Sequence, residues 1–116
     1  MKRKFRLTRS TDFKRVRRSG KSYAHPLVVL IYLPNDLEKT RFGVAAGRSV
    51  GNAVYRNRAK RQLREIIRPL IPMIQPGWDV ILLARKGMSN SKFQVIEDAV
   101  QSLFDRADLI SKSNVN

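Results

Sequence analysis

Residues 27–33, with the sequence LVVLIYL, form a continuous apolar run that is rich in branched side chains. Pro26 precedes the run, and Pro34 and Asn35 follow it. A short apolar run between turn residues is typical of a strand that is covered on both faces or nearly so. The run therefore points to a fold built on a sheet with helices packed against it.

Two further strands are predicted from the same kind of pattern. Residues 41–47, RFGVAAG, follow a period of two that places three apolar side chains on one side of a strand: Phe42, Val44 and Ala46. Because a turn-rich connection separates this segment from 27–33, we expect the two strands to pair as a hairpin with a longer loop. Residues 79–85, DVILLAR, are predicted to form the third strand.

A short N-terminal helix is predicted after a loose basic arm over residues 1–9. Ser10 or Thr11 can cap this helix, and Gly20 can end it. It carries an aromatic side chain, Phe13, next to Val16.

A longer helix is predicted from Asn52, which is a suitable cap, through Arg68. Pro69 is expected to kink or end it. Its apolar side chains recur at helical spacing: Ala59, Leu63, Ile66, Ile67 and Leu70.

A second amphipathic helix is expected to close the chain, and residues 111–116 are expected to fray. Candidate caps precede it: Ser89, Asn90 or Ser91. Its buried stripe is predicted to contain Ile96, Val100, Leu103, Ala107 and Ile110.

These elements predict a single α+β domain over residues 1–116. We expect a two-layer α/β sandwich, in which a small mixed sheet carries a basic crossover helix, an N-terminal helix and a C-terminal helix. The 116 residues and their 42% apolar content are sufficient for one small core.

The charge balance restricts the class of partner. With 24 Lys and Arg against 9 Asp and Glu, the formal net charge is +15, which suits a protein that binds a polyanion. No apolar run approaches the ~20 residues of a membrane-spanning helix, so we expect nucleic acid and not a membrane. No apolar segment of signal-peptide length follows the basic N-terminus, and a cytoplasmic location is expected.

The basic charge is concentrated on the long helix. Residues 54–65, VYRNRAKRQLRE, hold five cations and one anion. Spacings of four, three and four place Asn57, Arg61, Arg64 and Arg68 on one face. Like charges at this spacing destabilise an isolated helix, whereas arginine can bind phosphate oxygens bidentately, so this face is predicted to bind a phosphate backbone.

The sequence offers little for catalysis by the protein itself. The absence of cysteine excludes a disulfide scaffold, a zinc ribbon and a thiol nucleophile. The single histidine, His25, lies at a strand entrance and is predicted to be structural, and no clustered carboxylates suggest a metal site. We therefore expect no catalytic and no metal-binding residues, and no small-molecule substrate.

Three segments resemble a known family. Residues 51–65, GNAVYRNRAKRQLRE, resemble the signature helix of the bacterial ribonuclease P protein subunit, whose Arg-Asn-Arg core corresponds to Arg56, Asn57 and Arg58. Residues 12–21, DFKRVRRSGK, resemble the first helix of that family, and residues 79–88, DVILLARKGM, resemble the strand after its signature helix. The resemblance extends over nearly the whole chain, from about residue 7 to residue 110.

This resemblance implies a protein that binds the catalytic RNA of ribonuclease P and helps it to remove the 5′ leader of precursor tRNA. The RNA would carry the active site and hold the Mg²⁺ ions. On the family's pattern, the leader would lie in a cleft between the sheet and the first helix, contacted by Phe13, Lys14, Arg17 and Ile31. The residues in contact with the catalytic RNA would be Arg48, Asn52, Arg56, Asn57, Arg58, Lys60, Arg61 and Arg64.

Two positions depart from the family's pattern. The family often has a second aromatic residue where this chain has Arg17, and a second basic residue where it has Ser49. Phe13 could equally be a core residue of the first helix. A ribosomal or ribosome-assembly RNA-binding protein without an enzymatic role is the alternative function, because charge and composition fit it as well.

Overall fold

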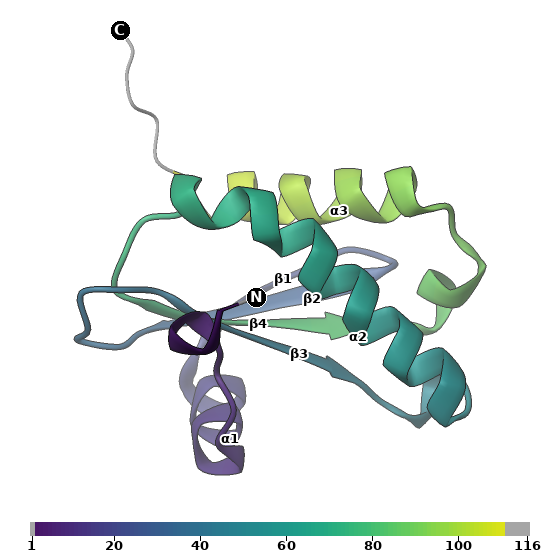
Figure 1. The fold of residues 1–116 in the computed structure, drawn as a ribbon, viewed down its shortest axis with the longest axis horizontal. Helices are drawn as coiled ribbons and strands as arrows, with labels where there is room; N and C mark the ends of the chain where they lie inside the picture. The colour runs from purple at the N-terminus through teal and green to yellow at the C-terminus, as the bar shows by residue number, and fades with distance from the viewer. Residues whose placement is uncertain (1, 111–116) are drawn as a thin grey trace, which may run out of the picture.

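One mixed sheet forms the centre of the molecule in the computed structural model, which describes residues 2–110 (Figure 1). The strand order is β1-β2-β4-β3, with β1 antiparallel to β2, β2 antiparallel to β4, and β3 parallel to β4. The strands are β1 (Lys21–Ala24), β2 (Val28–Pro34), β3 (Arg41–Ala46) and β4 (Trp78–Ala84). The predicted α+β class with a small mixed sheet is confirmed.

The predicted hairpin between the first two apolar strands is wrong. β4 lies between β2 and β3, so that Leu82 of β4 is opposite Leu30 of β2 and Val44 of β3. Five of the seven β4 residues are buried, and this strand occupies an interior position of the sheet, where both of its edges are paired. The period-two pattern defines a face of a strand but carries no information about which strand is its neighbour.

The strand β1 was not predicted from the sequence. Its four residues, KSYA, include no apolar run and are mostly exposed. The strand lies at the edge of the sheet and pairs only with β2. Its Tyr23 side chain packs against the main core.

The helices divide between the two faces of the sheet (Figure 1). α2 (Ala53–Ile67) and α3 (Phe93–Arg106) cover one face, and α1 (Ser10–Ser19) packs on the other. As predicted, the side chain of Asn52 caps α2 by accepting a hydrogen bond from the Tyr55 N–H at 3.2 Å. Pro69 lies in η3 (Arg68–Met73), a 3₁₀ helix that succeeds α2, so the predicted end of the helix is confirmed.

The predicted caps of α3 are wrong. Lys92 occupies the N-cap position, with no hydrogen bond from its side chain. Ser89 and Asn90 belong to a preceding 3₁₀ helix, η4 (Lys86–Asn90), and the Ser91 hydroxyl donates back to the Gly87 carbonyl at 3.0 Å. Ile110 lies beyond α3 and pairs with Ile74 in an isolated bridge, while Phe104 and Leu109 are buried in addition to the rest of the predicted stripe.

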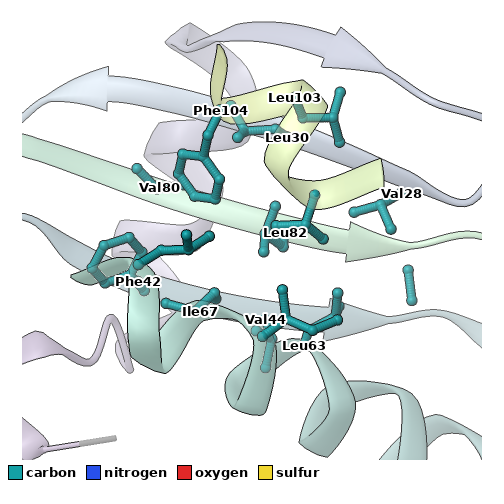
Figure 2. Packing of buried hydrophobic residues seen from close by; sticks show 14 of the residues in the cluster. Val28, Leu30, Phe42, Val44, Leu63, Ile67, Val80, Leu82, Leu103 and Phe104 are labelled. Carbon is teal, nitrogen blue, oxygen red and sulfur yellow. The ribbon is translucent and has the colours of Figure 1, made fainter. Parts of the chain in front are cut away.

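The main core lies between the sheet and the pair α2 and α3. Figure 2 shows Leu63 and Ile67 of α2 and Leu103 and Phe104 of α3 around the side chains of the sheet. A smaller cluster holds α1 to the opposite face of the sheet: Leu7, Val16, Ile31 and Ile81.

The N-terminal arm is attached to the sheet, although the sequence suggested a loose segment. Residues Arg3–Phe5 form a 3₁₀ helix, η1. The Leu7 N–H then donates to the Phe42 carbonyl at 2.8 Å, and the Leu7 side chain is buried. The predicted frayed tail, residues 111–116, lies outside the described residues.

Candidate RNA interface

The basic residues of α2 face outward because its apolar stripe is fully used by the core. Ala59, Leu63, Ile66 and Ile67 are all buried. The opposite side presents Asn57, Arg58 and Arg61 to solvent, with Arg56, Lys60 and Arg64 half-buried at its edges. The predicted basic face therefore exists on the folded protein.

Few of these cations have a partner within the protein. Arg68, at the end of α2, pairs with Glu65 at 2.5 Å, and an Arg56 guanidinium N–H donates to the Gly51 carbonyl at 3.1 Å. Within residues 2–110, no ion pair involves the remaining cations of the helix: Arg58, Lys60, Arg61 and Arg64. This positive charge is available to an external anion.

The turn before α2 adds one more cation to this region. Arg48 is exposed in the short 3₁₀ helix η2 (Arg48–Val50), which leads to Gly51 and then to the Asn52 cap. Gly51 has a φ of 141°, which favours glycine, so this residue allows the chain to turn from η2 into α2. Arg48 thus lies near the N-terminal end of the basic face.

A groove of about 690 Å³ lies on the α1 side of the sheet, and we call it the α1 groove. Arg17 of α1 borders it, and exposed Arg85 and Lys86 border it beyond β4. Its other lining residues are Val29, Ala45, Ala46, Gly47, Ser49, Leu83 and Ala84. An apolar lining with cations around it can hold the bases and phosphates of a single strand.

Phe13 is packed on the sheet and also lines an open hollow, so neither role that the sequence left open is excluded. Its ring lies directly over Gly43, where an added Cβ would be 2.4 Å from the ring Cζ. The half-buried ring also lines a second hollow of about 250 Å³, together with Arg6 and Arg64. Phe13 is thus packed on the sheet and accessible beside a cation of α2.

The other residues predicted to contact the leader differ in their exposure and position. Arg17 borders the α1 groove and Lys14 is exposed on α1, whereas Ile31 is 8% exposed and packed beneath α1. Val29, two residues earlier on the same face of β2, lines the groove instead. Its position follows from the period of a strand, once the face toward α1 is known.

The cations beyond β4 were also missed as site residues. Arg85 and Lys86 follow the predicted third strand in the sequence, and both line the α1 groove. Their basic character was visible, but their place beside α1 depends on the crossover that brings β4 next to β2.

A buried carboxylate fixes α1 against the sheet. Asp79 of β4 is 0% exposed and accepts hydrogen bonds from Arg41 of β3, Asn35 after β2, and Arg15 of α1. Burial raises the pKa of Asp79, but the hydrogen bonds from Arg41, Asn35 and Arg15 outweigh it, so that the pKa is lowered overall. We call this arrangement the Asp79 cluster; Asp12 of α1 completes it with ion pairs to Arg15 and Arg41.

The described residues offer no evident ligand set for a metal ion. Residues 2–110 contain no group of three or more His, Cys, Asp or Glu side chains that could hold one. The carboxylates of Asp12 in α1 and Asp79 in β4 are already bound by arginine. The His25 Nδ1 accepts a hydrogen bond from the Leu27 N–H at 3.0 Å, which stabilises the turn into β2.

None of the helices in the described part of the chain is both long and apolar enough to cross a membrane.

Comparison with known proteins identifies the family. The Ribonuclease P family model matches residues 1–108. A ribonuclease P protein component from Herpetosiphon aurantiacus is 42% identical over 109 residues, which cover 94% of this chain and 89% of that protein. Another from Dehalococcoides mccartyi is 40% identical over 114 residues, covering 98% of this chain and 93% of that protein.

Solved structures give the same result. The ribonuclease P protein of Staphylococcus aureus superposes with a TM-score of 0.84 and 26% identity, covering 92% of this chain and 98% of that chain. The protein from Thermotoga maritima has a TM-score of 0.78 and 30% identity, covering 87% and 96% of the two chains. The chain therefore belongs to the family of ribonuclease P protein components, which are subunits of an endoribonuclease ribonucleoprotein.

Proposed function

We propose that this protein binds ribonuclease P RNA through α2 and holds the 5′ leader of precursor tRNA in the α1 groove. The observation that carries the proposal is the set of cations on α2 that form no ion pair within residues 2–110. Arg64, one of them, lines a hollow together with Phe13. A rigid helix with unneutralised arginines suits a structured phosphate backbone. Phe13 lines the second hollow on the same face of the sheet as the α1 groove, and an accessible aromatic ring suits a single strand of variable sequence, because every base can stack.

In this proposal the protein positions RNA and does no chemistry on it. Arg48, Asn52, Arg56, Asn57, Arg58, Lys60, Arg61 and Arg64 would contact the RNA subunit. Mg²⁺ would be held mainly by that RNA. The cytoplasm, where tRNA is processed in bacteria, is the expected location.

Cleavage of a precursor tRNA by ribonuclease P RNA at low Mg²⁺, with and without this protein, tests the proposal. Strong stimulation is expected, because added cations reduce the repulsion between the two RNAs. No stimulation of a cognate RNA, combined with tight binding to ribosomal RNA, would favour the ribosome-assembly function instead.

Leader binding is tested by replacing Phe13. Phe13→Ala should weaken binding of precursor tRNA to the holoenzyme by about 1 to 3 kcal/mol, while binding of mature tRNA stays unchanged. Phe13→Tyr retains the ring and should retain the preference for precursor. Equal losses for precursor and mature tRNA would show that Phe13 acts through the fold alone.

A further inference from the structure

A third hollow, of about 340 Å³, lies on the α2 side of the molecule between η1 and η3, and we call it the Phe5 hollow. It is lined by Lys2, Lys4, Phe5, Arg68, Ile71 and Pro72. It shares no lining residue with the α1 groove or with the hollow beside Phe13. Phe5 and Ile71 pack against the main core, on the opposite face of the sheet from α1.

The lining of this hollow combines two chemistries. Phe5, Ile71 and Pro72 provide an apolar surface, of which Phe5 and Ile71 are half-buried and therefore fixed in place. Lys2, Lys4 and Arg68 are exposed cations around it. The Lys4 Nζ lies 5.1 Å from the centroid of the Phe5 ring, a cation–π contact.

A nucleotide is the ligand that uses both chemistries. Its base is planar and stacks on an aromatic ring, and its phosphate is an anion for lysine and arginine. An apolar ligand would leave Lys2 and Lys4 without an anion, and a free phosphate would leave the apolar surface unused. The volume is near the lower end for small-ligand pockets, which suits one nucleotide.

Both walls of the hollow are held before any ligand binds. The chain directly after η1 is tied to β3 by the parallel Arg6–Phe42 bridge, in which the Leu7 N–H donates to the Phe42 carbonyl. Pro69 and Pro72 restrict the backbone of η3. A preformed site avoids part of the entropic cost of ordering side chains on binding.

The hollow continues the basic face of α2. Arg68 is the last member of the row that contains Asn57, Arg61 and Arg64, and it also lines the hollow. Glu65 holds Arg68 by its ion pair and reduces the local charge without cancelling the two lysines. An RNA bound along α2 would therefore reach Phe5 at the end of the helix.

We propose that the Phe5 hollow binds one unpaired nucleotide of the ribonuclease P RNA. Its base stacks on Phe5 beside Ile71 and Pro72, and its phosphate is bound by Lys2, Lys4 and Arg68. The identity of the RNA rests on the proposed function. The hollow adds to it a second contact that recognises an unpaired base, separate from the leader site.

The test measures binding of the full-length protein to ribonuclease P RNA, without tRNA, over a range of salt concentrations. Phe5→Ala should weaken binding by about 5- to 150-fold at every salt concentration, because one stacked base is lost and no charge is removed. Lys4→Ala should lower the salt slope by about one unit. Phe93→Ala, which removes an exposed ring on α3, is the matched control and should bind like the wild type.

Because Phe5 packs against the core, Phe5→Ala could also disturb the fold. Phe5→Leu and Phe5→Trp separate the two effects, since leucine retains an apolar contact without stacking and tryptophan retains stacking. Binding that is restored by tryptophan and not by leucine supports the proposal. Equal binding by wild type, Phe5→Leu and Phe5→Ala would overturn it.

Two further outcomes are distinguishable. If the Phe5 variants bind ribonuclease P RNA normally but lose the preference for precursor over mature tRNA, the hollow holds the leader and our assignment is wrong. If the wild type itself neither binds ribonuclease P RNA nor stimulates cleavage, the proposed function fails together with this inference.

Discussion

Arg15 and Arg41 both bind the carboxylate of Asp79, which is fully buried, whereas Arg58, Arg61 and Arg64 form no ion pair within residues 2–110. The Asp79 cluster joins α1, β3 and β4, and its arginines are neutralised by the protein itself. The arginines of α2 lie on a helix whose one acidic side chain, Glu65, is paired with Arg68. The same residue type thus stabilises the fold in one region and remains available for RNA in the other.

The largest effect is expected when the Asp79 cluster is broken. Arg41→Met removes two of the hydrogen bonds to the buried carboxylate, and Arg15 and Asn35 remain. We expect a loss of about 3 kcal/mol in the free energy of unfolding, the lower end for a broken buried pair. Chemical denaturation measures it.

Arg58→Met on α2 is the matched control for this substitution. Arg58 is exposed and unpaired within the described residues, so its replacement should change stability by less than about 0.5 kcal/mol. Similar losses for Arg41→Met and Arg58→Met would remove the distinction between the two regions.

The next largest effect concerns RNA binding by α2. Arg61→Ala with Arg64→Ala should lower the slope of log affinity against log salt by roughly two units. Between 50 and 200 mM salt the wild type should then lose roughly tenfold more affinity than the double variant. The free energy of unfolding should change little, and an unchanged slope would mean that these side chains do not neutralise phosphates.

A smaller effect is expected from acid. The folded-state pKa of Asp79 is lowered, so its contribution to stability is present above its unfolded pKa of about 3.9 and is lost as the pH falls through the lower folded-state pKa. The free energy of unfolding of the wild type should therefore fall with acid more steeply than that of Asp79→Asn. Parallel curves for the two proteins below pH 4 would contradict this assignment.

The smallest effect should follow Glu65→Gln. This exposed pair with Arg68 should contribute less than about 0.5 kcal/mol to stability. Its removal frees one cation at the end of the basic face, so the salt slope for RNA binding should rise by less than one unit. A clear loss of stability would place Arg68 with the structural arginines of the Asp79 cluster.

The exposed basic face of α2 could be predicted from local sequence patterns. The spacing of apolar residues and the Asn52 cap predicted α2 and its outward basic face, because the period of a helix and the geometry of a cap are local properties. The pairing of strands could not be anticipated in the same way. β4 inserts between β2 and β3, and a hairpin was equally compatible with the pattern of residues 27–47.

The candidate site shows the same limit between what local sequence predicts and what depends on tertiary contacts. The sequence by itself determined the net charge, the helix that carries the unpaired arginines and the apolar faces of the strands, since each depends on residues close together in the chain. The tertiary structure alone decided that Arg15 and Arg41 meet Asp79, that Val29 replaces Ile31 in the α1 groove, and that Phe5 lies beside Arg68. These contacts join segments far apart in the sequence, and their formation depends on strand order and on which face of the sheet each helix covers.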